Sequence, residues 1–456
     1  MARFVTIDRD TPMLLPPDLR DWVPPGHLVH FIIDAIESID TTSAHINHRG
    51  TGNEQYPPAM LLALLVYSYC IGTFSSRQIE ASTHSDVAVR FLCANTHPDH
   101  DTLCTFRRKN SALLQQAFAQ ILEMAARCKF LKVGQVTVAI DGTKVLANAS
   151  KHSAVSYAGA ERKLQSLQCE IEELLAKAEQ ADSTPLQEGL TIPEELQRRH
   201  ERMAALRQAR AEMELRAQAR IGAETAEYQS KVAKREALRE NGKKPRGREP
   251  KPPAATPKST DQVNFTDPES RIMPTKDGFQ QCYNAQAGVD TDSRLIVGVR
   301  VSQSPNDKQE LPADLQAVQK HVRPATVLVD NAFASQEDIE KLEAQTPGLQ
   351  ILAAMGREAH GRTIRQLEQH PEPEAPPFKA DFVTRMKHRT STTAGRALYG
   401  LRKQTVEPVI GIIKAAMGFR RFSMRGYDKA GLEWTLVCLA YNLKRLHILG
   451  ATPKPA

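Results

Sequence analysis

Three acidic residues stand where carboxylates could do metal-assisted chemistry on phosphates. Asp141 follows the alternating apolar residues of VTVAI, Asp330 follows the apolar run ATVLV, and Glu407 lies in the late segment TVEPVIGIIKAAMGFRRF. Breaking or transferring a phosphodiester requires neutralisation of charge on the attacking and leaving oxygens, which two Mg²⁺ ions about 3.5–4 Å apart achieve. Mg²⁺ is a hard cation that prefers carboxylates to His or Cys. Two Asp at strand ends and one Glu from a helix would supply such a ligand set.

The elements expected around these acids follow a specific order. The first strand is expected to end at Asp141 and Gly142, and a hairpin around DTDS is expected to pair residues 283–289 with 295–301. A helix in NDKQELPADLQAVQKHV begins with a possible capping box, and the strand before Asp330, the helix SQEDIEKLEAQ and the strand LQILAAMG come next. Strand, hairpin, helix, strand, helix, strand and late helix is the order of the ribonuclease-H-like α/β fold.

The residue after Glu407 is a proline, which constrains the helix around it. Pro408 disfavours helical geometry at Glu407 and removes a backbone donor, so the helix is expected to begin or to kink here. Either outcome holds the carboxylate near a helix end, with Lys414 two turns further on nearly the same face. The alternative is that Glu407 only caps a helix and pairs with Lys403 or Arg402.

Positive charge is concentrated near this glutamate. The net charge is +7, and residues 385–429 contain eleven Lys or Arg against two acids, Glu407 and Asp428. Such a stretch indicates contact with nucleic-acid phosphates. Gly411 and Gly418 interrupt the helical pattern, which suggests a close approach by another backbone or by DNA.

The flanking segments suggest further domains. Residues 1–130 are expected to form short helices ending in Arg107, Arg108 and Lys109, either a helix-turn-helix DNA reader or an ordinary helical bundle. Residues 131–160 and 263–450 are expected to form the catalytic domain. Residues 161–262 between them are charged and Ala-rich, with apolar residues at three- and four-residue steps, and predict a coiled-coil arm followed by a basic Pro-rich linker.

Composition excludes several classes of protein. The seven Cys are scattered and never form a C-x-x-C pair, so neither a disulfide framework nor a zinc site is indicated. The N-terminus lacks an apolar signal region, and the apolar run near Ala59 is too short to span a bilayer. We therefore expect a soluble protein with no membrane partner.

Several segments together resemble one family. YPPAMLLALLVYSYCIGTFSSRQIE, AIDGTKVLANASKH, PESRIMPTKDGFQQCYNAQAGVD, VLVDNAF and VEPVIGIIKAAMGFRRFSMRG are similar to bacterial insertion-sequence transposases of the DDE class with a Y-R-E-K signature. The last segment is the most specific of these. The resemblance implies that Asp141, Asp330 and Glu407 bind two Mg²⁺ ions, with Mn²⁺ as a substitute.

The same resemblance implies how DNA is bound. Tyr399, Arg402 and Lys414 would form the signature at the cut end, although the usual spacing places the Arg where Lys403 stands. Terminal inverted repeats and target DNA would be the substrates of a homodimer in a synaptic complex at the bacterial nucleoid in the cytoplasm. A ribonuclease-H-like nuclease without strand transfer and a non-catalytic DNA-binding protein are the alternatives. The proposed DNA contacts are Tyr399, Arg402, Lys403, Lys414, Arg420, Arg421, Arg107, Arg108 and Lys109.

Overall fold

The chain forms two compact units, which are described separately. The computed structural model describes residues 18–47, 54–132, 134–181, 192–242, 245, 247–356 and 372–453. One unit contains Met1–Val145, Asn284–Met424 and Asp428–Ala456, and the other contains Leu146–Tyr283 and Arg425–Tyr427.

The first unit begins with helices that are specified locally. Helix α2 starts at Pro58, which the first turn tolerates because its N–H would be unpaired in any case. Asp86 and Asp99 cap α4 and α5 by accepting hydrogen bonds from the backbone N–H groups of Val89 and Thr102. The helices of this region are η1 (Leu19–Trp22), α1 (Leu28–Glu37), α2 (Pro58–Cys70), α3 (Ser76–Ser85), α4 (Val87–Leu92), α5 (His100–Lys109) and α6 (Ser111–Arg127).

A mixed sheet follows, with strand order β6-β5-β1-β7-β8. β1 pairs with β7 and β7 pairs with β8 in parallel, whereas β5 and β6 form the antiparallel hairpin that the sequence predicts. Backbone bonds from Thr291 N to Thr137 O and from Ala147 N to Gln281 O show that β5 and β1 run in opposite directions. The strands are β1 (Gln135–Leu146), β5 (Gly278–Asp290), β6 (Ile296–Ser302), β7 (Arg323–Val329) and β8 (Gln350–Ala353).

Strand β1 is longer than the sequence analysis predicts. It does not end at Asp141 and Gly142 but continues to Leu146. The reason is that its two edges have different partners: pairing with β7 is complete by Ala139, while the bonds to β5 extend to Ala147. Asp141 therefore lies within a strand, at the point where one neighbour ends.

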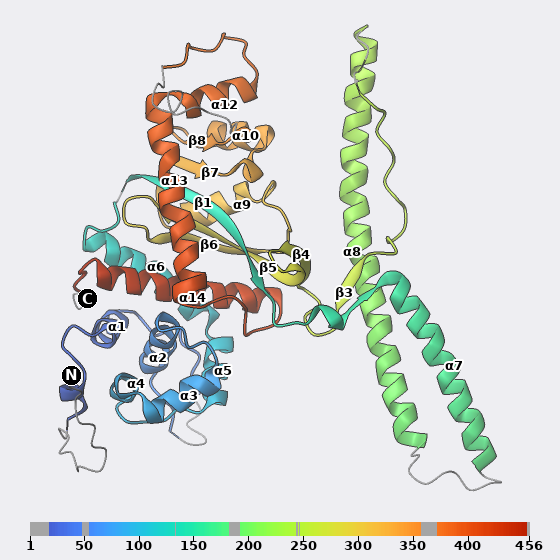
Figure 1. Cartoon of the computed structure of the whole chain (residues 1–456), viewed down its shortest axis with the longest axis horizontal. Helices are drawn as coiled ribbons and strands as arrows, with labels where there is room; N and C mark the ends of the chain where they lie inside the picture. Colours follow the sequence, from blue (N-terminus) through green and yellow to red (C-terminus); the bar gives the residue numbers. More distant parts are fainter. Residues whose placement is uncertain are drawn as a thin grey trace, which may run out of the picture. The chain divides into compact units, whose positions relative to one another are not determined.

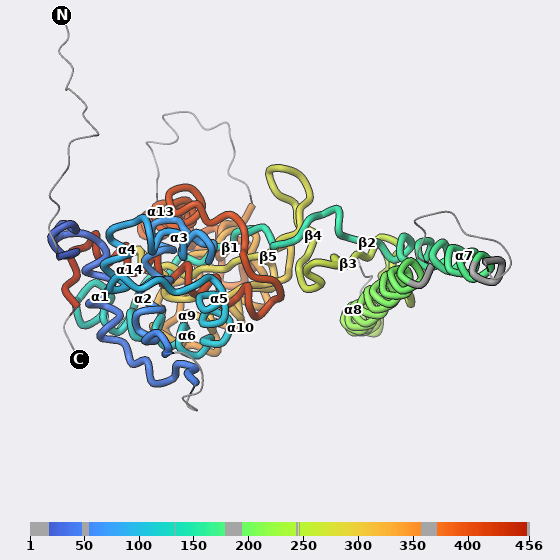
Figure 2. The backbone as a smooth tube through the Cα atoms, turned by 90° about the horizontal axis from the view of Figure 1, so that it is seen from below, coloured from blue at the N-terminus to red at the C-terminus, as the bar shows by residue number. Residues whose placement is uncertain are grey.

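Helices cover both faces of the sheet. Figure 2 shows α13 on one side of β1 and β5, and α9 and α10 on the other. Gly288 and Gly298 have no Cβ where Val318 of α9 packs against them, which permits this close approach. The helices after the hairpin are α9 (Leu311–Gln319), η3 (Asn331–Phe333), α10 (Gln336–Gln345), α12 (Phe382–Ser391), α13 (Thr393–Gly411), the π-helix η4 (Ile412–Ala416) and α14 (Tyr427–Ile448).

Helix α14 connects the sheet to the N-terminal helices of the same unit. The indole Nε1 of Trp434 donates to the backbone oxygen of Gln286 at 2.9 Å, and Asn442 bonds both backbone groups of Ile296 at 2.8 Å. On the α2 side, Tyr69 Oη donates to Glu433 Oε1 at 3.1 Å. The segment helps to close the core, because Leu432, Leu436, Leu439 and Leu443 are all buried.

The second unit contains a short strand pair and two long helices (Figure 1). β2 (Ala154–Ser156) pairs with β3 (Gln262–Asn264), next to η2 (Lys151–Ser153), and β4 (Arg271–Thr275) pairs with the first part of β5. α7 (Tyr157–Ala181) and α8 (Ile192–Glu240) pack through a cluster of buried apolar residues. The segment between them, DSTPLQEGLTIP, falls mostly outside the described residues. The cluster comprises Val155, Ala160, Leu167, Ile171, Met203, Leu206, Ala209, Met213 and Val263.

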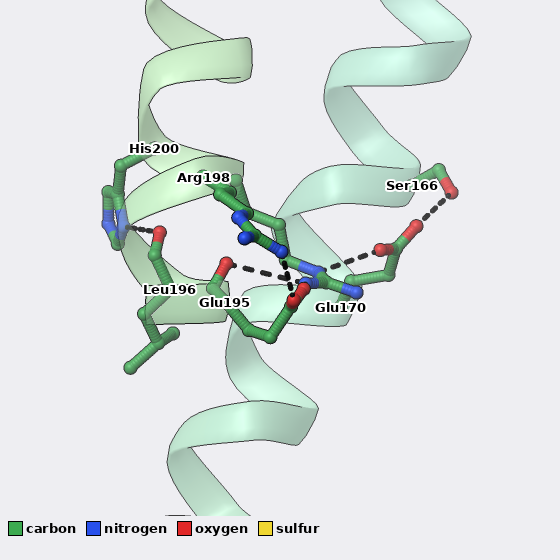
Figure 3. A network of polar contacts seen from close by, with 7 residues as sticks. Ser166, Glu170, Glu195, Leu196, Arg198 and His200 are labelled. Carbon is green, nitrogen blue, oxygen red and sulfur yellow. Dashed lines mark hydrogen bonds and ion pairs between the residues drawn. The ribbon is translucent and has the colours of Figure 1, made fainter. Parts of the chain in front are cut away.

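A polar network also joins these two helices (Figure 3). Arg199 of α8 donates from Nε to Glu170 of α7 at 2.9 Å and from NH1 to Glu195, four residues earlier in α8. An apolar seam with ion pairs beside it is the usual way in which two amphipathic helices associate.

The helices were also compared with the length and apolarity that a bilayer requires. None of the helices in the described ranges has a stretch that is both long and apolar enough to cross a membrane.

Candidate active site

The three acids of interest come from three elements of the first unit and lie close together. β1 and β7 are parallel neighbours with Ala139 opposite Leu328, so Asp141 and Asp330, each two residues further on, lie at the same level of the sheet. α13 contacts β7 (Figure 1). Glu407 of α13 contacts the same arginine, Arg402, as the two aspartates.

The guanidinium of Arg402, also on α13, contacts all three carboxylates. Its NH2 group lies 3.1 Å from Asp141 Oδ2 and 3.5 Å from Asp330 Oδ2, and its NH1 group lies 2.8 Å from Glu407 Oε1. The side chain of Arg402 is 8% exposed and that of Asp141 19%, whereas Asp330 and Glu407 are 47% and 49% exposed. The cluster is thus closed on the β1 side and open to solvent on the side of the other two acids.

Burial and charge act against each other in this cluster. Burial raises the pKa of Asp141 to about 6, although the charge of Arg402 and a hydrogen bond from Gly142 N favour the ionised form. Burial alone would lower the pKa of Arg402, but the charges of Asp141 and Asp330 outweigh it and raise this pKa.

Two further residues of the expected signature bind backbone oxygens nearby. Tyr399 Oη donates to Val329 O at 3.2 Å, one residue before Asp330, and burial raises the pKa of Tyr399. Lys414 Nζ donates to Lys144 O of β1 at 2.7 Å. Both side chains therefore tie α13 and η4 to the strands that carry the two aspartates.

Of the two outcomes predicted for Pro408, a helix that begins there is wrong. α13 neither begins nor caps at Glu407 but continues through Pro408 to Gly411 and then widens into the π-helix η4. A proline leaves the carbonyl four residues earlier, here that of Gln404, without its helical hydrogen bond. Of the alternative interpretation of Glu407, the pairing with Arg402 is observed and the cap is not.

The two glycines beyond Glu407 also differ from expectation. A Cβ at Gly411 or Gly418 would meet nothing within 4 Å, so neither glycine is required by a close approach within the protein. Gly418 has φ of +80°, which explains its presence after η4.

A group of residues under β1 was not identified from the sequence. Asp307 Oδ1 accepts hydrogen bonds from the side-chain amides of Asn284 at 2.6 Å and Gln286 at 2.7 Å. A Cβ on Gly142 would lie 2.5 Å from Gln286 Nε2 and 2.7 Å from Asp307 Oδ1. The expected capping box is wrong, because Glu310, not Asp307, is the N-cap of α9 and makes no side-chain cap bond. In the sequence, only the glycine that follows Asp141 indicated a close contact of β1 at this position.

Apart from Arg402 and Lys414, the proposed DNA-contacting cations fall into two groups. Lys403, Arg420, Arg421, Arg108 and Lys109 are exposed. Arg107 is buried, with NH1 bonded to Tyr69 Oη at 2.6 Å and 3.9 Å from Glu433 Oε1. The prediction for Arg107 is wrong, because its charge is used inside the helical core and it is not available to a phosphate.

The acids were tested as a site for a divalent metal. In the part of the chain that the structure describes, no group of three or more His, Cys, Asp or Glu is arranged as a metal site, and the guanidinium of Arg402 contacts all three acids. Their donor set nevertheless fits a hard cation: every ligand atom is a carboxylate oxygen, and all three already converge on one positive charge.

Two family models match the chain. The model described as "Transposase DDE domain" matches residues 255–443, which include Asp330 and Glu407, and the model "Transposase domain (DUF772)" matches residues 17–109. No curated protein and no solved structure matches the chain significantly. The chain therefore carries segments that match a DDE transposase domain and a second transposase domain on one polypeptide, which is consistent with an insertion-sequence transposase of the DDE class.

Proposed function

We propose that this protein binds the terminal inverted repeats of its own element, hydrolyses a phosphodiester at each end and joins the freed 3′-OH to target DNA. The observation that carries the proposal is the convergence of Asp141, Asp330 and Glu407 on a single cation within the fold of the first unit. Three carboxylates that lie close together repel one another, so the arrangement is unfavourable unless a cation binds between them.

The roles of the three acids differ with their environment. DDE transposases typically use a divalent metal, and two Mg²⁺ ions, or Mn²⁺ in their place, would supply activation of water and neutralisation of the leaving oxygen. Asp141 is the buried anchor of the site, whereas the half-exposed Asp330 and Glu407 leave the side on which a DNA strand can enter.

The surrounding cations and domains are assigned to DNA binding and assembly. Tyr399, Arg402 and Lys414 form the signature beside the cut end, with Lys403, Arg420 and Arg421 on the exposed surface and Arg108 and Lys109 in the N-terminal region. We assign 1–130 to DNA binding, 131–160 and 263–450 to a ribonuclease-H-like catalytic domain, and 161–262 to an inserted coiled-coil arm with its linker. The arm is a candidate contact in a dimeric synaptic complex, with the nucleoid as the site of action.

The test is cleavage of labelled duplex DNA that carries the repeats flanking the gene, in Mg²⁺ or in EDTA. Asp330→Asn and Glu407→Gln are each expected to abolish metal-dependent cutting at the repeat ends. Glu337→Gln, which removes one exposed acid from α10, is the charge-matched control and is expected to cut normally.

Each other result would favour a different function. Cutting by Asp330→Asn and Glu407→Gln at the rate of the unmodified protein would refute the assignment of the acids. Cuts without joined products would favour a nuclease that lacks strand transfer. Tight, metal-independent binding of the repeats with no cleavage would favour a non-catalytic DNA-binding protein.

A further inference from the structure

Arg402 has the surroundings of a counter-ion. Both terminal nitrogens of its guanidinium face carboxylates, and only 8% of the side chain is exposed to solvent. A side chain in this position cannot at the same time present its charge to a DNA phosphate.

The charge balance of the cluster indicates what Arg402 does there. Three ionised carboxylates and one guanidinium leave a residual charge of about −2, and without Arg402 this would be about −3 at a partly buried site. Like charges at short range destabilise one another, so Arg402 lowers the cost of holding Asp141, Asp330 and Glu407 together. The negative charge that remains attracts a divalent cation from the open side.

Arg402 is held by these charges and is not otherwise locked in place. Its Nε–H is buried without a hydrogen-bond partner among the described residues. An unpaired buried donor is unfavourable, which would assist the departure of the side chain once its charge is no longer needed. Arg402 and Glu407 lie five residues apart on one helix, so a rotamer change is sufficient for the guanidinium to leave the carboxylate.

We propose that Arg402 is an internal counter-cation, which positions the three carboxylates in the metal-free protein and competes with divalent metal for the same oxygens. This inference rests on the proposed function, because it takes Asp141, Asp330 and Glu407 as the metal ligands. If these carboxylates held a divalent metal, the guanidinium of Arg402 would move toward the open side of the site, where its charge would become available to DNA.

The test compares Mn²⁺ binding to the full chain in the absence of DNA, by calorimetric titration and by the loss of the free Mn²⁺ resonance. A neighbouring unit charge changes the proton affinity of a carboxylate by about 10- to 1,000-fold. Arg402→Gln is therefore expected to bind Mn²⁺ at least about tenfold more tightly than the unmodified protein. Lys403→Gln removes the same charge one residue away, from an exposed side chain, and is expected to stay within about threefold.

A second readout separates competition from a general effect on folding. In EDTA, Arg402→Gln is expected to melt at a lower temperature than the unmodified protein, and Mn²⁺ is expected to restore more of its stability than it adds to the unmodified protein. Arg402→Lys keeps one charge but not the planar fork, and it is expected to bind Mn²⁺ with intermediate affinity. If Arg402→Gln does not fold, the Mn²⁺ affinity of Arg402→Lys tests the proposal in its place.

The outcomes distinguish this inference from the proposed function. If Asp141→Asn loses Mn²⁺ binding while Arg402→Gln binds no more tightly than Lys403→Gln, the counter-cation role is overturned and the triad stands. Equal or weaker Mn²⁺ binding by Arg402→Lys, relative to the unmodified protein, would overturn it as well. If Asp141→Asn and Asp330→Asn bind Mn²⁺ normally, the acids are not the metal site and both proposals fail.

Discussion

At the scale of single residues, two arginines that look alike in the sequence serve opposite purposes. Arg107 and Arg108 are neighbours at the end of α5, yet one is buried against Tyr69 and Glu433 and the other is exposed. Glu433 has no exposed surface and accepts bonds from the backbone N–H groups of Ser423 and Met424. Arg107 therefore places a positive charge beside a carboxylate that has no exposed surface.

The prediction at this scale concerns stability. Arg107→Met leaves Glu433 buried without its counter-charge, and it should lower the free energy of unfolding by about 3–5 kcal/mol. Arg108→Met changes an exposed side chain and should alter it by no more than about 0.5 kcal/mol. Urea unfolding followed by circular dichroism measures both. Equal stability of the two variants would show that Arg107 is not part of the core.

At the scale of secondary-structure elements, the position of Asp141 depends on the contact under β1. The backbone of Gly142 packs closely against the side-chain amide of Gln286, which donates a hydrogen bond to Asp307. The side chains of Asp141 and Gln286 are on opposite faces because neighbouring residues of a strand alternate. A change beneath the strand would therefore be transmitted to the carboxylate above it.

Gly142→Ala is expected to destabilise the protein and to weaken metal-dependent cleavage. Its Cβ would overlap the Gln286 amide and Asp307, a kind of overpacking that costs about 1–3 kcal/mol. Gly400→Ala is the control, since a Cβ there meets nothing within 4 Å in α13 and should stabilise the helix by about 0.5–1 kcal/mol. Thermal unfolding of the two variants would contradict this expectation if Gly142→Ala were the more stable.

The contact of α9 with β6 predicts a pH dependence. Asp314 of α9 accepts a hydrogen bond from Arg300 Nε at 2.8 Å, and burial raises the pKa of Asp314 from 3.8 to about 7. Between these two values the folded state holds a proton that the unfolded state has released, so this group stabilises the fold at low pH and loses that contribution as the pH rises toward 7.

The measurement is the difference in unfolding free energy between the unmodified protein and Asp314→Asn. As the pH rises from about 4 to about 7, the unmodified protein should lose stability relative to Asp314→Asn, because Asn does not titrate. A difference that is constant over this range would mean that Asp314 is ionised throughout.

At the scale of the whole molecule, the two units are expected to unfold separately. The helices α7 and α8 bury their own apolar cluster within the second unit, as an independently folding region does. Leu206 belongs to this cluster and is 2% exposed, whereas Leu215 of the same helix is 64% exposed.

Leu206→Ala should therefore shift only one of two calorimetric transitions. The loss of a buried Leu costs about 2–5 kcal/mol, and the transition of the first unit should stay in place. Leu215→Ala should leave both transitions nearly unchanged. A single transition that moves as a whole would show that the two units unfold together.

Local patterns were sufficient to predict some of this architecture but not all of it. The hairpin of β5 and β6 and the apolar strand before Asp330 follow from short-range signals. The parallel pairing of β1 with β7 brings Asp141 and Asp330 to the same level of the sheet. The burial of Arg107 depends on Glu433 in α14, and the length of β1 depends on its pairing with β5. α13 continues through Pro408 while it packs against β7. These features depend on residues that are far away in the sequence, so the spacing of neighbouring residues does not predict them.

The position of α14 between the sheet and the N-terminal helices has a consequence for biosynthesis. Tyr69 and Glu433 are 364 positions apart, so at about 5–20 residues per second the ribosome completes the first roughly 20–70 seconds before the second. During that interval the nascent N-terminal helices lack the helix against which Tyr69 and Cys70 are buried. Translation that stops before α14 would release a chain without a finished interior, a substrate for proteases and not a smaller working enzyme.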